Sequence, residues 1–247
     1  GPEDAEIIQT HPASGFWNLA GPAAPGTDYQ SIDGSLISMA AQTISREYYK
    51  NRRSLSERFA EMDEKIKAPS FRQSTGKANE VNYWVFDYPP EQELEVRSHI
   101  EWLEKRNRKG FDDYKLIIYD LYDIIIDRLI EKGFIEKTKK LESRGGIQRV
   151  VTAIQRMLRI TDKDNYLVHY LEEHTSENAV VLITGIGKCY PILEAPEVFN
   201  KVLYNLPQKF SATPVILFYP GTYTEQELIV FNEFVEDSYY RAFRIAR

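Results

Sequence analysis

Two uninterrupted apolar runs stand out in the second half of the chain. They are Val180 to Ile183 and Val215 to Tyr219, and each ends in a turn that contains glycine or proline. A strand buried on both faces needs no alternation of apolar and polar residues, and these runs have almost none. With the helical-looking segment between them, they predict the strand, turn, helix, strand unit from which parallel sheets are built.

Further apolar runs, bounded by turn residues, extend this pattern along the chain. We expect strands near 81–87, 115–119, 179–184 and 214–219, and a closing strand at 240–246. Between them, helical spacing predicts helices at 54–66, 91–106, 121–132, 147–159 and 163–174. In the second of these, Leu94, Ile100 and Leu103 are predicted to face inward. The pattern therefore predicts an α/β fold, with a mostly parallel sheet flanked by helices and preceded by an irregular N-terminal arm plus helix.

Residues 1–53 differ in character from the rest and are predicted to be an N-terminal extension or an appended segment. Residues 10–34 are rich in glycine and proline, which disfavours regular structure, and a helix is expected at 36–50. Phe16 and Trp17 form an apolar cluster in the arm, and we expect them to dock on a surface. The pair Ser54 and Glu57 has the spacing of a capping box and predicts the first helix of the main domain, 54–247.

Composition narrows the class of protein. The net charge of −6 argues against broad, unspecific binding to nucleic acid, which requires a basic face. The single cysteine, Cys189, excludes an internal disulfide framework and favours a reducing compartment. No apolar run approaches the roughly 20 residues that span a bilayer. We therefore expect a cytoplasmic protein without membrane contact.

The most basic part of the chain surrounds the glycine pair Gly145-Gly146. The basic residues there are Lys137, Lys139, Lys140, Arg144 and Arg149. We expect a mobile loop over 137–149 that leads into a helix. Lys139, Lys140, Arg144 and Arg149 are candidate contacts for an anionic partner; the alternative is a solvated loop.

The segment after the strand at 179–184 is a candidate phosphate loop. A Walker loop requires G-x-x-x-x-G-K-[ST], whose glycines let backbone amides surround the phosphates. Here Gly187-Lys188 is followed by Cys189, and Leu182 occupies the position of the first glycine. A degenerate nucleotide-binding or hydrolytic enzyme using the loop Gly185 to Lys188 is therefore the alternative, not the leading hypothesis.

No other constellation of reactive residues is complete. A nucleophilic Cys189 would need a base, and the sequence places no histidine beside it, so a buried structural thiol is the favoured interpretation. Asp120, Asp123 and Asp127 share a helical face at spacings of three and four residues, which is typical of a solvent-facing stripe. The sequence therefore predicts a protein that is not an enzyme, with no catalytic residue, metal site or cofactor.

The segment FYPGTY at 218–223 suggests a docking surface rather than chemistry. Tyr219 and Tyr223 flank a Pro-Gly turn at a strand end, where open parallel sheets usually present binding surface. Arg241 and Arg244, in the last predicted strand, are candidate anchors for a carboxylate or phosphate. Together with Phe16 and Trp17, these residues are the candidate partner-binding set.

Several separated strings in the chain resemble one known family. They are VFDYPPEQELEVR at 85–97, LITGIGKCYPIL at 182–193, the pair Asn205-Leu206, TPVILFYPGTY at 213–223 and YYRAFRI at 239–245. In this order they resemble the BrxB family of bacterial BREX phage-defence systems, over about residues 54–245.

The resemblance implies a core component of a phage-restriction system that also carries an adenine methyltransferase, an ATPase and the alkaline-phosphatase-like protein PglZ. Members of the family are regarded as small non-catalytic subunits, so no active site is carried over. The implied role is an interaction and assembly module that docks PglZ, with other BREX subunits as further partners and DNA contact only within a complex. Residues 1–53 have no counterpart in the resemblance.

Overall fold

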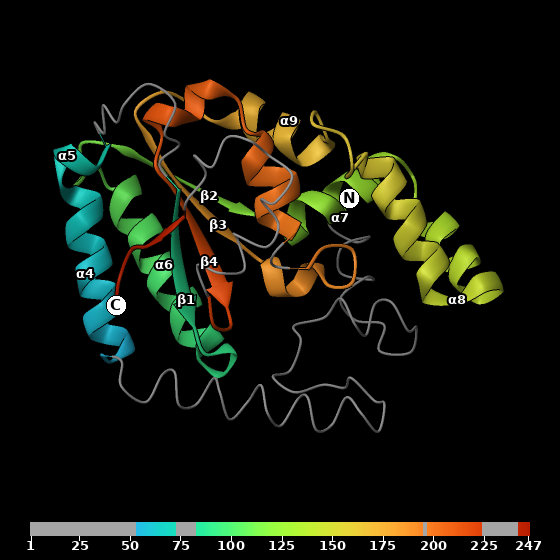
Figure 1. The fold of residues 1–247 in the computed structure, drawn as a ribbon, viewed down its shortest axis with the longest axis horizontal. Coiled ribbons are helices and arrows are strands. Elements are labelled where there is room, and N and C mark those ends of the chain that lie inside the picture. Colours follow the sequence, from blue (N-terminus) through green and yellow to red (C-terminus); the bar gives the residue numbers. More distant parts are fainter. Residues whose placement is uncertain (1–52, 73–82, 195–196, 224–241) are drawn as a thin grey trace, which may run out of the picture. The chain divides into compact units, whose positions relative to one another are not determined.

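The computed structural model describes residues 53–72, 83–194, 197–223 and 242–247 (Figure 1). The predicted arm with Phe16 and Trp17, the helix expected at 36–50 and Arg241 lie outside these residues. The chain divides into two compact units. Within the described residues, the first contains 53–118, 176–182, 208–223 and 242–247, and we call it the sheet unit. The second contains 119–175, 183–194 and 197–207, and we call it the helical unit.

Five strands form one parallel sheet in the order β2-β3-β4-β1-β5. Their bounds are β1 Tyr83–Tyr88, β2 Lys115–Asp120, β3 Ala179–Thr184, β4 Val215–Pro220 and β5 Phe243–Arg244. β1 pairs with β4 along its whole length, and on its other side it pairs with β5 only at Trp84 and Val85. The prediction of an α/β fold with a mostly parallel sheet is confirmed, although the closing strand is shorter than expected.

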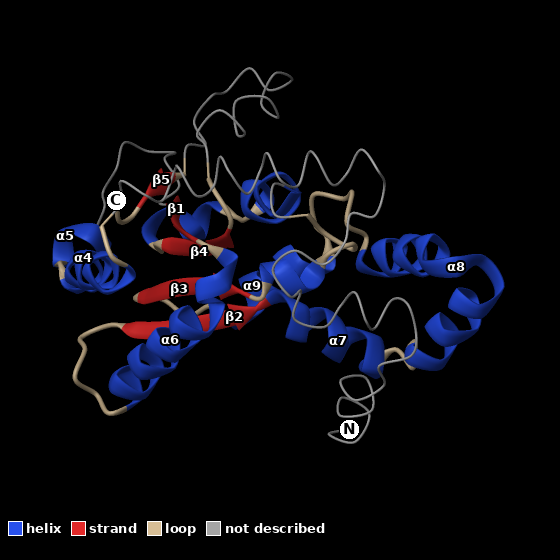
Figure 2. Cartoon of the chain, turned by 90° about the horizontal axis from the view of Figure 1, so that it is seen from below, coloured by secondary structure: helices blue, strands red, loops and turns tan. Residues whose placement is uncertain are grey.

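In the sheet unit, helices α4 (Leu55–Lys67) and α6 (Glu93–Arg108) lie on the same side of the strands (Figure 2). Helix α4 begins with the predicted capping box: the Ser54 hydroxyl accepts from the Glu57 N–H at 3.2 Å, and the Glu57 carboxylate accepts from the Ser54 N–H at 2.9 Å. The short helix α5 (Pro69–Arg72) follows. The helices and the sheet share one apolar core that includes Phe59, Met62, Ile66, Phe86, Val96, Ile100, Leu103, Val180, Ile216 and Phe218.

The inward face of α6 differs from the prediction at one position. Leu94 is 74% exposed, whereas Val96, Ile100 and Leu103 are buried. A 3₁₀ turn at Pro90–Gln92 precedes the helix, which begins only at Glu93. Spacings of four and three residues then turn Val96, not Leu94, toward the sheet together with Ile100 and Leu103.

The helical unit contains helices α7 (Leu121–Glu131), α8 (Ile135–Leu158) and α9 (Tyr166–His174). Short helical turns η2 (Ile186–Cys189), η3 (Val198–Val202) and η4 (Leu203–Asn205) replace the helix expected between β3 and β4, and η5 (Gln208–Ala212) completes this connection in the sheet unit. α9 starts at Tyr166, later than predicted, because Asn165 caps it by accepting from the Val168 N–H at 3.1 Å. No helix in the described part of the chain is long and apolar enough to cross a membrane.

Helix α8 corrects the prediction of a loop over 137–149. This segment is helical, and only Gly146 departs from helical geometry, with φ of 73° and ψ of −176°. The departure bends α8 into two arms, which Figures 1 and 2 both show. A positive φ is readily adopted by glycine and disfavoured for other residues. The glycine pair was therefore a sign of a bend within a helix rather than of a loop.

Candidate functional site

The carboxyl end of β1 carries a fully buried acidic side chain, Asp87, which is 0% exposed. Its Oδ1 accepts from the guanidinium of Arg58 on α4 at 3.0 Å. Its Oδ2 accepts from Nε of Arg244 at 3.4 Å and from the backbone N–H of Tyr223 at 3.2 Å. A buried charge needs this kind of compensation, because the interior does not solvate it. We call Asp87, Arg58, Arg244 and Tyr223 the Asp87 cluster.

The Asp87 cluster joins segments that are distant in the sequence. The Tyr223 hydroxyl donates to the Ala242 carbonyl at 2.9 Å, and the Arg244 guanidinium donates to the Tyr223 carbonyl. Arg58 also donates to the Ala246 carbonyl at 3.4 Å, and its guanidinium lies 4.6 Å from the centre of the Phe86 ring. Burial, followed by the nearby charge of Arg247, lowers the pKa of Arg244. The cluster thus ties α4, the ends of β1 and β4, and the last residues of the chain together.

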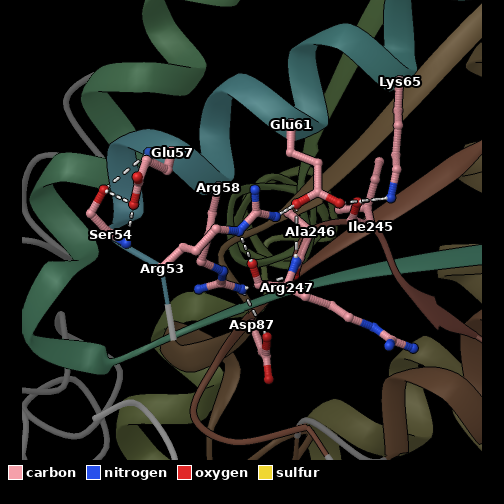
Figure 3. A network of polar contacts seen from close by, with 10 residues as sticks. All are labelled: Arg53, Ser54, Glu57, Arg58, Glu61, Lys65, Asp87, Ile245, Ala246 and Arg247. Atoms are coloured by element: carbon pink, nitrogen blue, oxygen red, sulfur yellow. Dashed lines mark hydrogen bonds and ion pairs between the residues drawn. The ribbon is translucent and has the colours of Figure 1, made fainter. Parts of the chain in front are cut away.

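Contacts next to the cluster hold the last residues against α4 (Figure 3). Lys65 donates to the Ile245 carbonyl at 2.6 Å, and the backbone N–H of Arg247 donates to Glu61 at 3.3 Å. Arg53 donates to the backbone oxygen of Arg247 at 2.8 Å and also forms an ion pair with Glu61. These groups are partly exposed and surround the buried Arg58–Asp87 pair, so the arrangement is that of a structural joint.

The carboxyl end of β2 carries a second acidic residue, Asp120, in the helical unit. Its Oδ1 accepts from the Asp123 N–H at 3.1 Å and so caps α7, while its Oδ2 accepts from Lys188 Nζ at 2.8 Å. The Lys188 ammonium also lies 5.2 Å from the centre of the Tyr122 ring. The expected acidic stripe therefore holds for Asp123 and Asp127, which are exposed, but Asp120 is a cap paired with a lysine.

Gly185 makes this pairing possible. Its φ is +75°, and a Cβ at this position would lie 2.1 Å from Oδ1 of Asp120. A larger residue would therefore displace the carboxylate that neutralises Lys188. In a phosphate loop the lysine faces the ligand, whereas a phosphate approaching this lysine would meet the negative charge of Asp120.

Cys189 is fully buried, as predicted, and its Sγ lies 3.4 Å from the Gly185 carbonyl. Burial, with a further contribution from the charge of Asp120, raises the pKa of the thiol far above its usual range. A protonated, inaccessible thiol is a poor nucleophile. Within the described residues, no group of three or more His, Cys, Asp or Glu side chains is arranged to hold a metal ion.

The structure places the candidate partner-binding residues unevenly. Tyr219 and Tyr223 are 7% and 1% exposed, with their ring centres 6.0 Å apart, and Arg244 reaches from β5 to the carboxylate of Asp87. Tyr223 and Arg244 therefore lie together, but within the Asp87 cluster and not on an open surface. Their assignment as partner contacts stays a prediction, as does that of Phe16, Trp17 and Arg241, which lie outside the described residues.

The candidate anion contacts all lie on α8. Lys140, Arg144 and Arg149 are exposed, and Lys139 is partly buried and paired with Glu136 at 3.1 Å. Among the described residues, none of the four contacts Asp120 or Lys188. They therefore form a separate surface.

Sequence reasoning did not single out Asp87 or its partner Arg58. The available signal was the set of family strings: Asp87 lies in VFDYPPEQELEVR, Tyr223 in TPVILFYPGTY and Arg244 in YYRAFRI. Residues from three separated strings therefore meet at one buried carboxylate.

The fold and these sites define an α/β protein whose best-formed polar cluster is structural and whose phosphate-like strand end is internally neutralised. The family model described as "BREX protein BrxB" matches residues 117–245. A BREX protein BrxB of Bacillus cereus (strain H3081.97) is 35% identical over 193 residues, which cover 78% of this chain and 98% of the relative. A BREX protein BrxB of Escherichia coli O9:H4 (strain HS) is 28% identical over 191 residues, covering 77% of this chain and 91% of the relative.

The chain therefore belongs to the BrxB family of BREX phage-defence systems. The resemblance stated from the sequence strings is confirmed. No solved structure matches the chain significantly.

Proposed function

We propose that this protein is a non-catalytic core subunit of a BREX phage-defence complex, and that it acts as an interaction and assembly module that docks PglZ. Family membership supports the BREX assignment. The observation that carries the non-catalytic role is the loop after β3, where Lys188 is paired with Asp120 and the Cys189 thiol is buried. The reduced thiol is also consistent with the proposed cytoplasmic location.

We assign the docking surface to the edge of the sheet formed by β5. Phe243 on this strand is 49% exposed, and its ring centre lies 6.0 Å from that of Trp84, which in turn lies 5.1 Å from that of Phe71. In the described part of the chain, β5 is the last strand on this side of the sheet. Exposed aromatic residues are enriched among those that dominate protein interfaces, and an edge strand offers backbone groups for pairing. A folded protein partner such as PglZ fits these features.

The test is the affinity of tagged protein for purified PglZ, measured by biolayer interferometry. We expect micromolar or tighter association, and Phe243→Ala should weaken it at least about tenfold, as truncation of an aromatic residue that dominates an interface does. Phe111→Ala is the matched control, because Phe111 is also exposed, at 72%, but lies in the loop between α6 and β2. This variant should bind as the unmodified protein does.

No association at micromolar concentration would contradict the docking role itself. Unchanged binding by Phe243→Ala would leave docking in place but move it to another surface. Equal losses in the Phe243 and Phe111 variants would show that the effect is not specific to the sheet edge.

The alternative, a degenerate nucleotide-binding or hydrolytic enzyme, draws on the position of Lys188 at the carboxyl end of β3, where parallel sheets often bind ligands. A ligand at 100 times its dissociation constant stabilises the folded state by about 2.7 kcal/mol. Thermal unfolding with ATP or GTP and Mg²⁺ therefore tests this alternative directly. We expect no shift, because Asp120 already neutralises Lys188.

A further inference from the structure

Helix α8 concentrates positive charge in a chain that is acidic overall. It carries six basic and two acidic residues, whereas the chain has a net charge of −6. Lys137, Lys140 and Arg144 follow one another at spacings of three and four residues, and all three are exposed. This spacing places them along one face of the first arm of the helix, over about 10 Å at a rise of ~1.5 Å per residue.

A fourth cation lies on an adjacent flank of the helix at the bend. Arg149 is in the second arm, but a Cβ built on Gly145 would lie 2.2 Å from its Cδ, so the Arg149 side chain lies directly over the Cα of Gly145. Gly145 thus leaves room for Arg149 to fold back toward the first arm. We call Lys137, Lys140, Arg144 and Arg149 the basic stripe.

Among the described residues, the charges of the stripe have no ionic partner. Lys140, Arg144 and Arg149 have no ion pair or side-chain hydrogen bond in the described part of the chain, and Lys137 contacts only the Phe134 ring, at 4.9 Å. Lys139, which lies between two members of the stripe, is instead paired with Glu136. The four cations of the stripe are therefore left for solvent or a ligand.

We propose that the basic stripe of α8 binds the phosphate backbone of duplex DNA. Exposed, unpaired Lys and Arg side chains bind phosphates and release condensed counterions, which gives affinity without sequence readout. Single strands are typically held by several exposed aromatic side chains on which successive bases stack, whereas the one aromatic ring recorded beside the stripe, Phe134, is partly buried and covered by Lys137. A bent helix with exposed cations along its first arm and at its bend can follow the regular phosphate backbone of a duplex. The contact goes beyond PglZ docking and uses a different part of the molecule.

The test measures binding of the full chain to a fluorescent 30-base-pair DNA duplex by anisotropy, over a range of salt concentrations from about 50 to 200 mM. Each phosphate contact contributes about −0.9 to the slope of log affinity against log salt. With four contacts we expect a slope of about −3.6. The variant Lys140→Gln/Arg144→Gln/Arg149→Gln should bind at least about tenfold more weakly at low salt, and its slope should be shallower by about 2.7.

The matched control is Lys109→Gln/Lys115→Gln/Lys163→Gln. It removes the same charge from three exposed lysines outside α8 and should keep both the affinity and the slope. Both variants change only exposed side chains, so circular dichroism and the thermal midpoint should match the unmodified protein.

Three results would overturn the proposal. They are no binding to the duplex at 50 mM salt, equal losses in the stripe variant and the control variant, and displacement of the duplex by poly-glutamate as effectively as by unlabelled DNA. The last result would identify the stripe as a site for an acidic protein. The assay contains no PglZ, so its outcome is independent of the docking experiment.

Discussion

Two aspartates at the carboxyl ends of parallel strands, Asp87 in β1 and Asp120 in β2, are each paired with a cation, but in different surroundings. The side chains of Asp87 and its partner Arg58 are 0% and 2% exposed. Those of Asp120 and its partner Lys188 are 24% and 20% exposed. The same kind of residue at the same kind of position thus serves as a buried joint in one unit and as a partly hydrated helix cap in the other.

The difference matters because the cost of breaking an ion pair depends on what is left behind. A buried cation that loses its carboxylate has no water to replace it, whereas a partly exposed lysine does. Asp87 also receives donors from three separate segments, whereas Asp120 is bonded to the first turn of its own helix and to Lys188. We therefore expect Asp87 to govern stability and Asp120 to govern local structure.

The largest effect is expected from Asp87→Asn. The change keeps the shape of the side chain but leaves Arg58 buried without its counter-charge, which typically costs about 3–5 kcal/mol. The free energy of unfolding from urea titration measures this loss. Asp162→Asn is the control, because Asp162 is also paired with an arginine, Arg159, but the two side chains are 43% and 60% exposed. It should cost less than about 1 kcal/mol, and similar losses in both variants would contradict the comparison.

A smaller effect is expected from Gly185→Ala. The new Cβ would collide with Asp120 and would also sit at a positive φ, so we expect a loss of about 2–3 kcal/mol. Gly110→Ala separates the two causes, because Gly110 has a similar φ of +79° but nothing within 4 Å of the added Cβ. That control should lose only about 1 kcal/mol in the same urea titration. Equal losses would show that the contact with Asp120 contributes nothing.

The two roles of Asp120 can be separated by a pair of substitutions. Asp120→Ala removes both the cap on α7 and the partner of Lys188, and should cost about 1–2 kcal/mol. Asp120→Asn keeps a side-chain oxygen for capping and loses only the charge, so it should cost less than about 1 kcal/mol. Only the charge contribution should shrink in high salt, which urea titrations at two ionic strengths will measure. An equal cost for both substitutions would assign the whole effect to the ion pair.

The sequence pattern predicted β3 and β4 well because strands buried on both faces are continuous apolar runs. β3 at Ala179–Thr184 matches the predicted range, and β4 at Val215–Pro220 differs from it by one residue at each end. The capping box at Ser54 and Glu57 was also predicted correctly, since its two residues are only three positions apart. The bend in α8 was not predicted, because a glycine pair is compatible with a loop or with a helix that changes direction, and packing decides between them.

The Asp87 cluster shows why side-chain pairs distant in the sequence could not be predicted from it. Arg58 is 29 positions from Asp87, and Arg244 is 157 positions from it, so no spacing rule connects them. Similarly, Asp120 and Lys188 are 68 positions apart, and their pairing depends on Gly185 leaving space for the carboxylate. Sequence reasoning rejected the phosphate loop from missing motif positions, and the structure adds the charge that neutralises its lysine.

The smallest effect is expected at alkaline pH, from Tyr122 beside Asp120. Burial, with smaller contributions from the charges of Cys189, Asp123 and Asp120, raises the pKa of Tyr122 to about 12. Because the folded state holds this proton more tightly, stability is complete below the unfolded pKa of about 10 and falls as pH rises toward 12. Tyr122→Phe should flatten this fall by about 1 kcal/mol or less, since partial hydration screens the effect. Thermal midpoints between pH 9 and 11.5 measure it, with Tyr170→Phe as the control. An unchanged slope for Tyr122→Phe would show that the Asp120 end of the sheet is more hydrated than its burial indicates, which would widen its contrast with Asp87.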